Sequence, residues 1–244
     1  MINPQDFFDL SNLAEPFAGL FSGVERVWEA LARLQPYLES LFPQQAAILG
    51  QVEAGATLVN PEQIYIGPGS HVQAGAYIIG PAYIGADCEV RHGAYLRGSV
   101  MAGDHCVLGH ASEFKNALLL PGSQAPHFAY VGDSILGQRV NLGAGTRLAN
   151  VEILSGRHKV KTGQRPTIKI RLPGLAEPVD TGLRKLGAIL GDDAQSGCNT
   201  VTNPGCLIGP GALIYPNVSL SKGYWPAGKI IKLRQDLETI ELRP

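Results

Sequence analysis

Apolar residues recur at every sixth position in the middle of the chain. They are Ile66, Val72, Ile78, Ile84, Val90, Leu96, Ala102, Leu108, Phe114 and Leu120. Two places upstream of these lies a register of mostly small residues: Ile64, Ser70, Ala76, Ala82, Cys88, Ala94, Val100, Cys106, Ser112 and Leu118. A helix repeats every 3.6 residues and a strand every two, so a period of six indicates neither alone. It is typical of the hexapeptide repeat of a parallel β-helix.

The same spacing returns twice further along the chain. Leu136, Leu142 and Leu148 continue it, and Leu190, Ser196, Thr202, Ile208, Ile214 and Leu220 resume it. In such a solenoid three six-residue sides close one coil, and stacked coils bury what a single coil would expose. We therefore predict a mainly β protein, with a left-handed parallel β-helix over residues 49–226.

Residues 1–48 predict a short N-terminal helical segment. From Val24 to Leu41 the apolar residues follow helical spacing, with Ser22 and Glu25 as a possible capping box. Pro36 should kink or split this helix and Pro43 should end it. We expect the segment to pack on the end of the solenoid, since the first coil of a repeat array needs a cover.

A basic insertion of about residues 151–187 interrupts the solenoid. It holds more cations than anions: Arg157, Lys159, Lys161, Arg165, Lys169, Arg171, Arg184 and Lys185 against Glu152, Glu177 and Asp180. Residues 167–172 alternate like an exposed strand, and 160–161 are a possible pairing partner. This insertion is either a solvated hairpin or a contact for a phosphate-bearing ligand. The tail, 227–244, is expected to form a final strand or helix.

Composition narrows the classes of function. The formal net charge is −1, so no global electrostatic attraction to nucleic acid is expected. No run of about 18 apolar residues indicates a membrane span, and no signal peptide is evident, so we expect a cytoplasmic protein. Cys88, Cys106 and Cys206 fall in the small register and are expected to be buried thiols, whereas Cys198 does not.

Four sequence runs near the first break in the repeat carry a resemblance. They are Tyr95-Leu96-Arg97, Glu113-Phe114-Lys115-Asn116-Ala117, His127 to Asp133, and Val140 to Thr146. With their separations, they resemble the acetyltransferase half of the bacterial family that combines glucosamine-1-phosphate acetyltransferase with N-acetylglucosamine-1-phosphate uridyltransferase. The resemblance covers about residues 60–220 and implies transfer of acetyl from acetyl-CoA to the amine of an amino-sugar phosphate.

The resemblance also implies roles for individual residues. His127 corresponds to the general base, and a neutral imidazole suits removal of a proton from an amine. Arg97 and Lys115 correspond to phosphate-binding residues. The remaining correspondences are Tyr130, Asn141 and Asn150 for the sugar, Lys185 for a further substrate lysine, and Ala144 and Cys198 for acetyl-CoA. The family also implies a homotrimer with sites between neighbouring subunits, and no metal.

The chain departs from the family in several places. The uridyltransferase domain is absent, so that activity is not predicted. Asn150-Val151-Glu152-Ile153 stands where the family has Asn-Tyr-Asp-Gly, and Cys198 replaces a serine. The family's arginine in the C-terminal tail has no secure counterpart.

Other interpretations remain open. His127 could cap a loop, Arg97 and Lys115 could form intersubunit salt bridges, and Tyr130 could be a packing anchor. A zinc site of the β-helix carbonic anhydrase type would use His71, His105 and His110, but the first two lie 34 residues apart, whereas two coils span about 36. A third alternative is a non-catalytic sugar-phosphate or sugar-nucleotide sensor or scaffold.

Overall fold

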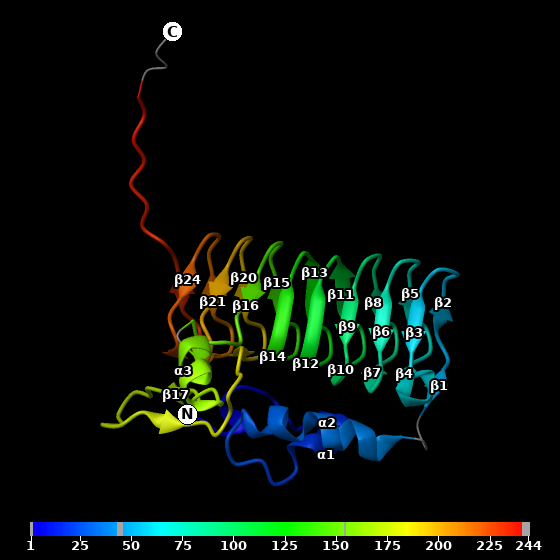
Figure 1. Ribbon diagram of the computed structural model, residues 1–244. Helices are drawn as coiled ribbons and strands as arrows, with labels where there is room; N and C mark the ends of the chain where they lie inside the picture. The colour runs from blue at the N-terminus through cyan, green and yellow to red at the C-terminus, as the bar shows by residue number, and fades with distance from the viewer. Residues whose placement is uncertain (1, 43–45, 154, 241–244) are drawn as a thin grey trace.

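The computed structural model describes residues 2–42, 46–153 and 155–240. It is a solenoid of about ten coils, with helices along one flank and a C-terminal segment that extends away from the last coil (Figure 1). The coils are made of short parallel strands, each hydrogen-bonded to the corresponding strand of the next coil. The left-handed parallel β-helix predicted from the six-residue period is confirmed.

The strands form two large sheets. The first contains β1 (Ala47–Ile48), β3 (Thr57–Val59), β4 (Ile64–Ile66), β6 (Tyr77–Ile79), β7 (Ala82–Ile84), β9 (Tyr95–Arg97), β10 (Val100–Ala102), β12 (Glu113–Leu119), β14 (Tyr130–Leu136), β16 (Arg147–Leu148), β19 (Ala188–Leu190), β21 (Val201–Thr202), β22 (Cys206–Ile208), β24 (Ser219–Leu220) and β25 (Gly223–Trp225). The second contains β2 (Gln51–Val52), β5 (His71–Val72), β8 (Glu89–Val90), β11 (Val107–His110), β13 (Gln124–His127), β15 (Asn141–Leu142), β20 (Gln195–Ser196), β23 (Leu213–Ile214) and β26 (Ile230–Ile231). The first sheet covers two sides of the solenoid, because the long strands β12 and β14 each turn a corner and continue on the next side.

The interior of the solenoid is filled by the two predicted registers. The large positions from Ile66 to Phe114 are fully buried in one continuous core, together with small residues such as Ala76 and Ala94. Cys88, Cys106 and Cys206 are buried in the same core as predicted, and Cys198 is exposed.

The predicted register is wrong at its last position, Leu120. Ile64 pairs with Ala82, eighteen residues on, but Val100 pairs with Ala117, only seventeen residues on. The corner after Phe114 is therefore one residue shorter, and Asn116 turns it with a φ of 48°. As a result, Ala117 and Leu119 point into the solenoid. The outward-facing residues Leu118 and Leu120 join a second core.

This second core lies on the flank and joins the N-terminal segment to the solenoid. Its helices are α1 (Phe17–Phe21) and α2 (Glu29–Leu41), with short 3-10 turns at Pro4–Asp6 and Pro61–Gln63 elsewhere. Buried residues of the segment, including Trp28 and Leu34, share this core with outward-facing residues of the first sheet. The expectation that the segment covers the end of the solenoid was wrong, because an apolar band runs along the flank: Met101, Leu118, Leu120, Ile135, Ile189 and Leu207.

The start of α2 also differs from the prediction. The helix begins at Glu29 rather than after Ser22, and the Glu29 carboxylate accepts hydrogen bonds from the backbone N–H groups of Glu25 and Arg26, both at 3.1 Å. Pro36 lies inside the helix without ending it. The predicted end at Pro43 lies outside the described residues.

The insertion leaves the solenoid after β16 and returns before β19. It contains the helix α3 (Ser155–Thr162) and an antiparallel pair, β17 (Lys169–Ile170) with β18 (Val179–Asp180). The predicted pairing with residues 160–161 was wrong, since these lie in α3. Ile168, Ile170 and Leu172 are buried in the flank core, so one face of the insertion is packed rather than solvated.

The tail begins with a strand, one of the two predicted forms. β26 pairs with β23, and residues 232–240 then run out from the solenoid without helix or strand (Figure 1). Within the described part of the chain, no helix is long and apolar enough to cross a membrane.

Candidate functional site

The shortened corner of the solenoid places three polar side chains around one carboxylate. Asp133 has a side chain that is only 7% exposed. Its Oδ1 accepts hydrogen bonds from Lys115 Nζ at 3.3 Å and from Asn116 Nδ2 at 3.0 Å. Its Oδ2 accepts one from Asn150 Nδ2. A buried carboxylate is costly unless it is paired, so these donors and Asp133 hold one another in place.

Arg97 lies one coil before this corner, beside Glu113. The Arg97 Nη1 atom is 2.6 Å from Glu113 Oε1, and the guanidinium carbon lies 5.8 Å from the centre of the Tyr95 ring. The hydrogen bond and charge of Glu113 raise the pKa of Arg97. This salt bridge lies within one chain, so the alternative of an intersubunit salt bridge stays a prediction. An anionic ligand at Arg97 has to share the guanidinium with Glu113.

Tyr130 borders the same side of the solenoid, next to Asn150. Burial, followed by the charges of Glu113 and Asp133, raises the pKa of its hydroxyl, and a hydrogen bond with Asn150 opposes this. A Cβ atom at Gly132 would lie 2.5 Å from that hydroxyl, so any larger residue there would displace the Tyr130 side chain. The interpretation of Tyr130 as a packing anchor was wrong, since the neighbouring Val131 occupies the interior.

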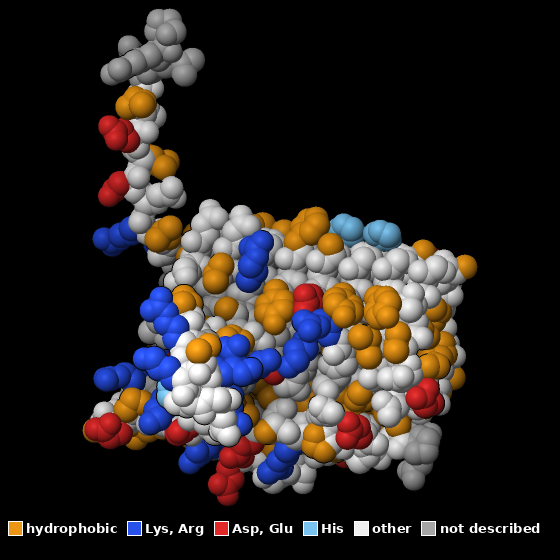
Figure 2. Space-filling view, viewed as in Figure 1, with side chains coloured by type: hydrophobic (Ala, Val, Ile, Leu, Met, Phe, Trp, Pro, Cys, Tyr) orange, Lys and Arg blue, Asp and Glu red, His pale blue; other side chains and the backbone are white. Residues whose placement is uncertain are grey.

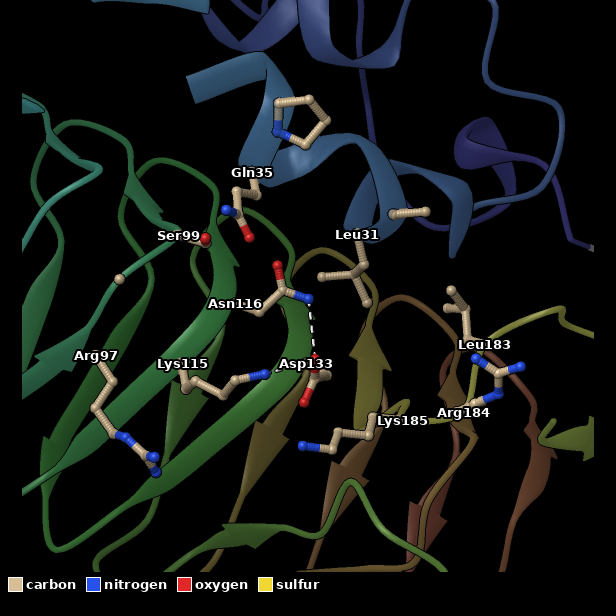
Figure 3. A pocket seen from close by; sticks show the side chains of 13 residues that line it. Leu31, Gln35, Arg97, Ser99, Lys115, Asn116, Asp133, Leu183, Arg184 and Lys185 are labelled. Carbon is tan, nitrogen blue, oxygen red and sulfur yellow. Dashed lines mark hydrogen bonds and ion pairs between the residues drawn. The ribbon is translucent and has the colours of Figure 1, made fainter. Parts of the chain in front are cut away.

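A cavity of about 430 Å³ opens over this corner. Its lining residues come from α2, the solenoid and the returning end of the insertion: Leu31, Ala32, Gln35, Pro36, Arg97, Gly98, Ser99, Lys115, Asn116, Asp133, Leu183, Arg184 and Lys185. In Figure 3 the amino groups of Lys115 and Lys185 point toward Asp133 from opposite sides. The structure therefore brings Arg97, Lys115 and Lys185 to one cavity, with Asn150 bonded to its floor at Asp133.

His127 lies on a different edge, at the end of β13 and three residues before Tyr130. Its side chain is exposed, and its ring centre is 6.4 Å from that of Phe128. The backbone N–H of Gly145 donates to the His127 carbonyl at 3.0 Å, and that of Asn199 donates to the Ala144 carbonyl at 2.8 Å. His127, Ala144 and the segment next to Cys198 therefore follow one another along one edge in successive coils.

Asn141 is separate from both groups. It lies on β15 in the second sheet, between Gln124 and Gln195 of the neighbouring coils. The structure thus gathers most of the predicted residues into two groups. Arg97, Lys115 and Lys185 form a cationic corner, and His127 lies on a separate edge with Ala144 and the segment next to Cys198. Tyr130 lies between the two groups, and Asn141 lies outside both.

Sequence reasoning gave no role to Asp133, Asn116 and Gln35, and it named Arg184 only as one of the basic residues of the insertion. Asp133 and Asn116 lay within the runs that carried the resemblance, and the shortened coil is what turns them toward Lys115. Gln35 and Arg184 come from segments outside the six-residue period, so no repeat signal placed them here.

The three histidines of the zinc hypothesis do not converge. His71 Nε2 lies 2.7 Å from Glu53 Oε1, and His105 Nδ1 lies 3.9 Å from Asp87 Oδ2. His110 Nδ1 lies 2.8 Å from the carbonyl oxygen of His92. Over residues 2–42, 46–153 and 155–240, no group of three or more His, Cys, Asp or Glu residues could hold a metal ion. Zinc needs converging ligands, so this hypothesis has no site in the described chain.

Comparison with known proteins adds to this geometry. Residues 78–169 match the family described as the GMPPB C-terminal domain. A bifunctional sugar-1-phosphate nucleotidylyltransferase/acetyltransferase of Sulfurisphaera tokodaii is 34% identical over 110 residues, which are 45% of this chain and 24% of that protein. The bifunctional protein GlmU of Methanococcus maripaludis is 37% identical over 106 residues, which are 43% and 23% of the two chains.

The chain is similar to bifunctional proteins of the GlmU type. The resemblance inferred from the four sequence runs is thereby confirmed. The chain spans about a quarter of the length of these relatives. Among solved structures, the acetyltransferase domain of PglB from Neisseria gonorrhoeae is 14% identical, with a TM-score of 0.31 over 81% of this chain and 62% of that domain.

Proposed function

We propose that this chain is an acyltransferase that moves acetyl from acetyl-CoA to the amine of an amino-sugar phosphate. The observation that carries the proposal is the placement of a cationic corner, with Arg97, Lys115 and Lys185, next to an edge that bears His127. Tyr130 lies between the two. The similarity to proteins named as nucleotidylyltransferase/acetyltransferase supports a reaction of this class.

In the proposed reaction His127 acts as the general base. The amine nitrogen attacks the thioester carbonyl, forming a C–N bond, and the C–S bond breaks to release CoA thiolate. The imidazole accepts the proton that the amine loses and passes it on to the thiolate, so the products are the amide and CoA thiol. A neutral imidazole performs this proton transfer well near pH 7.

The phosphate of the acceptor would bind at Arg97, Lys115 and Lys185, which supply guanidinium and ammonium donors. Asp133 holds Lys115 and Asn150 in position. The acyl donor would lie along the edge of Ala144 and Cys198. A shallow groove of about 300 Å³ adjoins that edge, lined by Gly197 and Pro216 among others, and offers room there.

The test of this function is a thiol-release assay over a panel of amino-sugar phosphates, nucleotide-linked amino sugars included, and acyl-CoA donors. We expect CoA release that depends on the acceptor and an N-acylated product in the mass spectrum. The absence of acceptor-dependent release with every combination would refute the acyltransferase proposal.

A non-catalytic sugar-phosphate sensor is the second candidate. Binding of an amino-sugar phosphate by calorimetry, without CoA release from any donor, would select this candidate.

The Arg97–Glu113 pair provides a prediction of opposite effects. Arg97→Ala should weaken binding of the phosphorylated acceptor about tenfold or more, as expected for a charged hydrogen bond of about 1.5–3 kcal/mol. Glu113→Gln should strengthen binding, because it releases the guanidinium from its carboxylate partner at 2.6 Å. Calorimetric titration of both variants checks this, and equal affinities in all three proteins would mean that Arg97 does not contact the phosphate.

Assembly into a homotrimer is part of the proposal. Tyr77 and Tyr95 are 42% and 38% exposed and pair in register, so a row of aromatic rings lies open beside Arg97. Such a row favours burial between copies. Light scattering is expected to give about three times the chain mass of 26.0 kDa. A stable monomer at micromolar concentration would contradict it.

A further inference from the structure

The cavity over the cationic corner is built from three parts of the chain. The solenoid supplies the floor, α2 supplies one wall, and residues 183–185 at the end of the insertion supply another (Figure 3). Its volume of about 430 Å³ falls within the range of about 300–1,000 Å³ that is usual for small-molecule sites. A phosphate group alone needs only the floor. The site therefore has room for a group beyond the phosphate.

Cationic side chains line the additional space as well as the floor of the cavity. Arg97, Lys115, Arg184 and Lys185 are cationic, and Asp133 is the acidic residue of the lining. Arg184 donates to the Gln164 side chain at 2.6 Å. Among the described residues Lys185 forms no hydrogen bond or ion pair. In Figure 2 the blue side chains form a stripe that runs from the insertion to the face of the solenoid. A ligand with two anionic groups would match this distribution better than one with a single group.

The wall formed by α2 has a different character. Pro36 on α2 and Leu183 from the insertion present apolar surface to the cavity, whereas Leu31 lines it but is only 3% exposed. The Gln35 side chain points from α2 toward Asn116 (Figure 3). Apolar surface with a few amide donors and acceptors suits a flat heterocyclic ring that has polar edges. A nucleoside attached to two phosphates combines this ring with the two anionic groups.

We propose that the cavity binds the nucleoside 5′-diphosphate part of the acceptor, so that the acceptor is a nucleotide-linked amino sugar. This inference rests on the proposed function and narrows its substrate class. The phosphate next to the sugar lies at Arg97 and Lys115, and the other lies at Lys185 and Arg184. The nucleoside packs against α2, and the sugar extends past Tyr130 toward His127.

The experiment is calorimetric titration of the full chain with UDP, GDP, CDP, dTDP and ADP, alongside inorganic phosphate and CoA. At least one diphosphate should bind at least about tenfold more tightly than inorganic phosphate, a difference of about 1.4 kcal/mol. CoA at saturating concentration should leave this binding unchanged, because the donor is placed on the separate edge of Ala144 and Cys198.

Two variants locate the binding. Ala32 is exposed on α2 and lines the cavity, so Ala32→Tyr should fill it and weaken diphosphate binding at least about tenfold. Ser40→Tyr, on an exposed position of the same helix outside the cavity lining, is the matched control and should bind as the natural chain does. Arg184→Ala combined with Lys185→Ala should weaken the diphosphate by a larger factor than inorganic phosphate.

Two results would overturn the inference: that no nucleoside diphosphate binds more tightly than inorganic phosphate, or that CoA displaces it. If an amino-sugar 1-phosphate is nevertheless acylated, the proposed function stands without this inference. If a diphosphate binds in the cavity but no acceptor is acylated, the inference on binding stands and the acyltransferase proposal fails.

Discussion

Replacing His127 with alanine is expected to lower turnover by roughly 10²–10⁴, the usual contribution of a general base. The side chain is exposed at the end of β13. It is neither in the solenoid core nor in the flank core, so its removal should leave the fold intact. Binding of the acceptor should also persist, because the cationic corner lies on the other side of Tyr130.

The measurement is acceptor-dependent CoA release at saturating substrates, together with acceptor affinity by calorimetry. His105→Ala is the matched control, since this histidine side chain is 70% exposed on another corner. Turnover of the control should equal that of the natural chain. If His127→Ala also releases CoA at the natural rate, then His127 is not the base and the proposed mechanism is wrong.

Phe114→Ala is expected to destabilise the protein by about 3–5 kcal/mol, the usual cost of removing a buried phenylalanine. Phe114 is fully buried inside the solenoid, and it pairs in register with Leu96 on one side and Val131 on the other. The void left by the missing ring would lie inside the solenoid, directly behind Lys115, where two neighbouring coils turn the shortened corner. Local collapse there is opposed by the regular stacking of the strands.

Phe128→Ala is the control for the same chemical change. Its side chain is 54% exposed on the edge after β13, so its removal should change the free energy of unfolding by much less. Denaturant unfolding followed by circular dichroism compares the two variants. Equal losses would indicate that the interior of the solenoid is not the main source of stability at this coil.

The solenoid was predictable because its signal is local. One inward apolar residue per side repeats over the nine successive sides from Ile66 to Phe114, and nothing distant is needed to recognise it. The one-residue shift in register after Phe114 was not predictable, because Leu118, Leu119 and Leu120 are all apolar. Any of them satisfies a hydrophobic interior, and only the shortened corner at Asn116 decides which one points inward.

The flank shows a related limit. An apolar stripe on α2 indicates that the helix packs on another apolar surface. That surface is made of outward-facing residues that alternate with the inward ones along the strands, such as Met101 and Ile135. The pattern therefore predicted the helix and missed its location. Because Gln35 reaches the cavity only through this location, the composite site could not be foreseen either.

The join between the insertion and the solenoid has a consequence for how such chains diversify. The backbone N–H of Leu186 donates to the carbonyl of Asn150 at 3.1 Å, so the two ends of the insertion meet where they leave the coil. Coil stacking continues across this join, with β16 pairing with β21 and β14 with β19. Since the entropy of closing a loop grows only slowly with its length, changes in the length of this segment outside its packed residues Ile168, Ile170 and Leu172 cost little stability. The insertion, whose end forms one wall of the proposed acceptor site, can thus change during evolution while the solenoid stays the same.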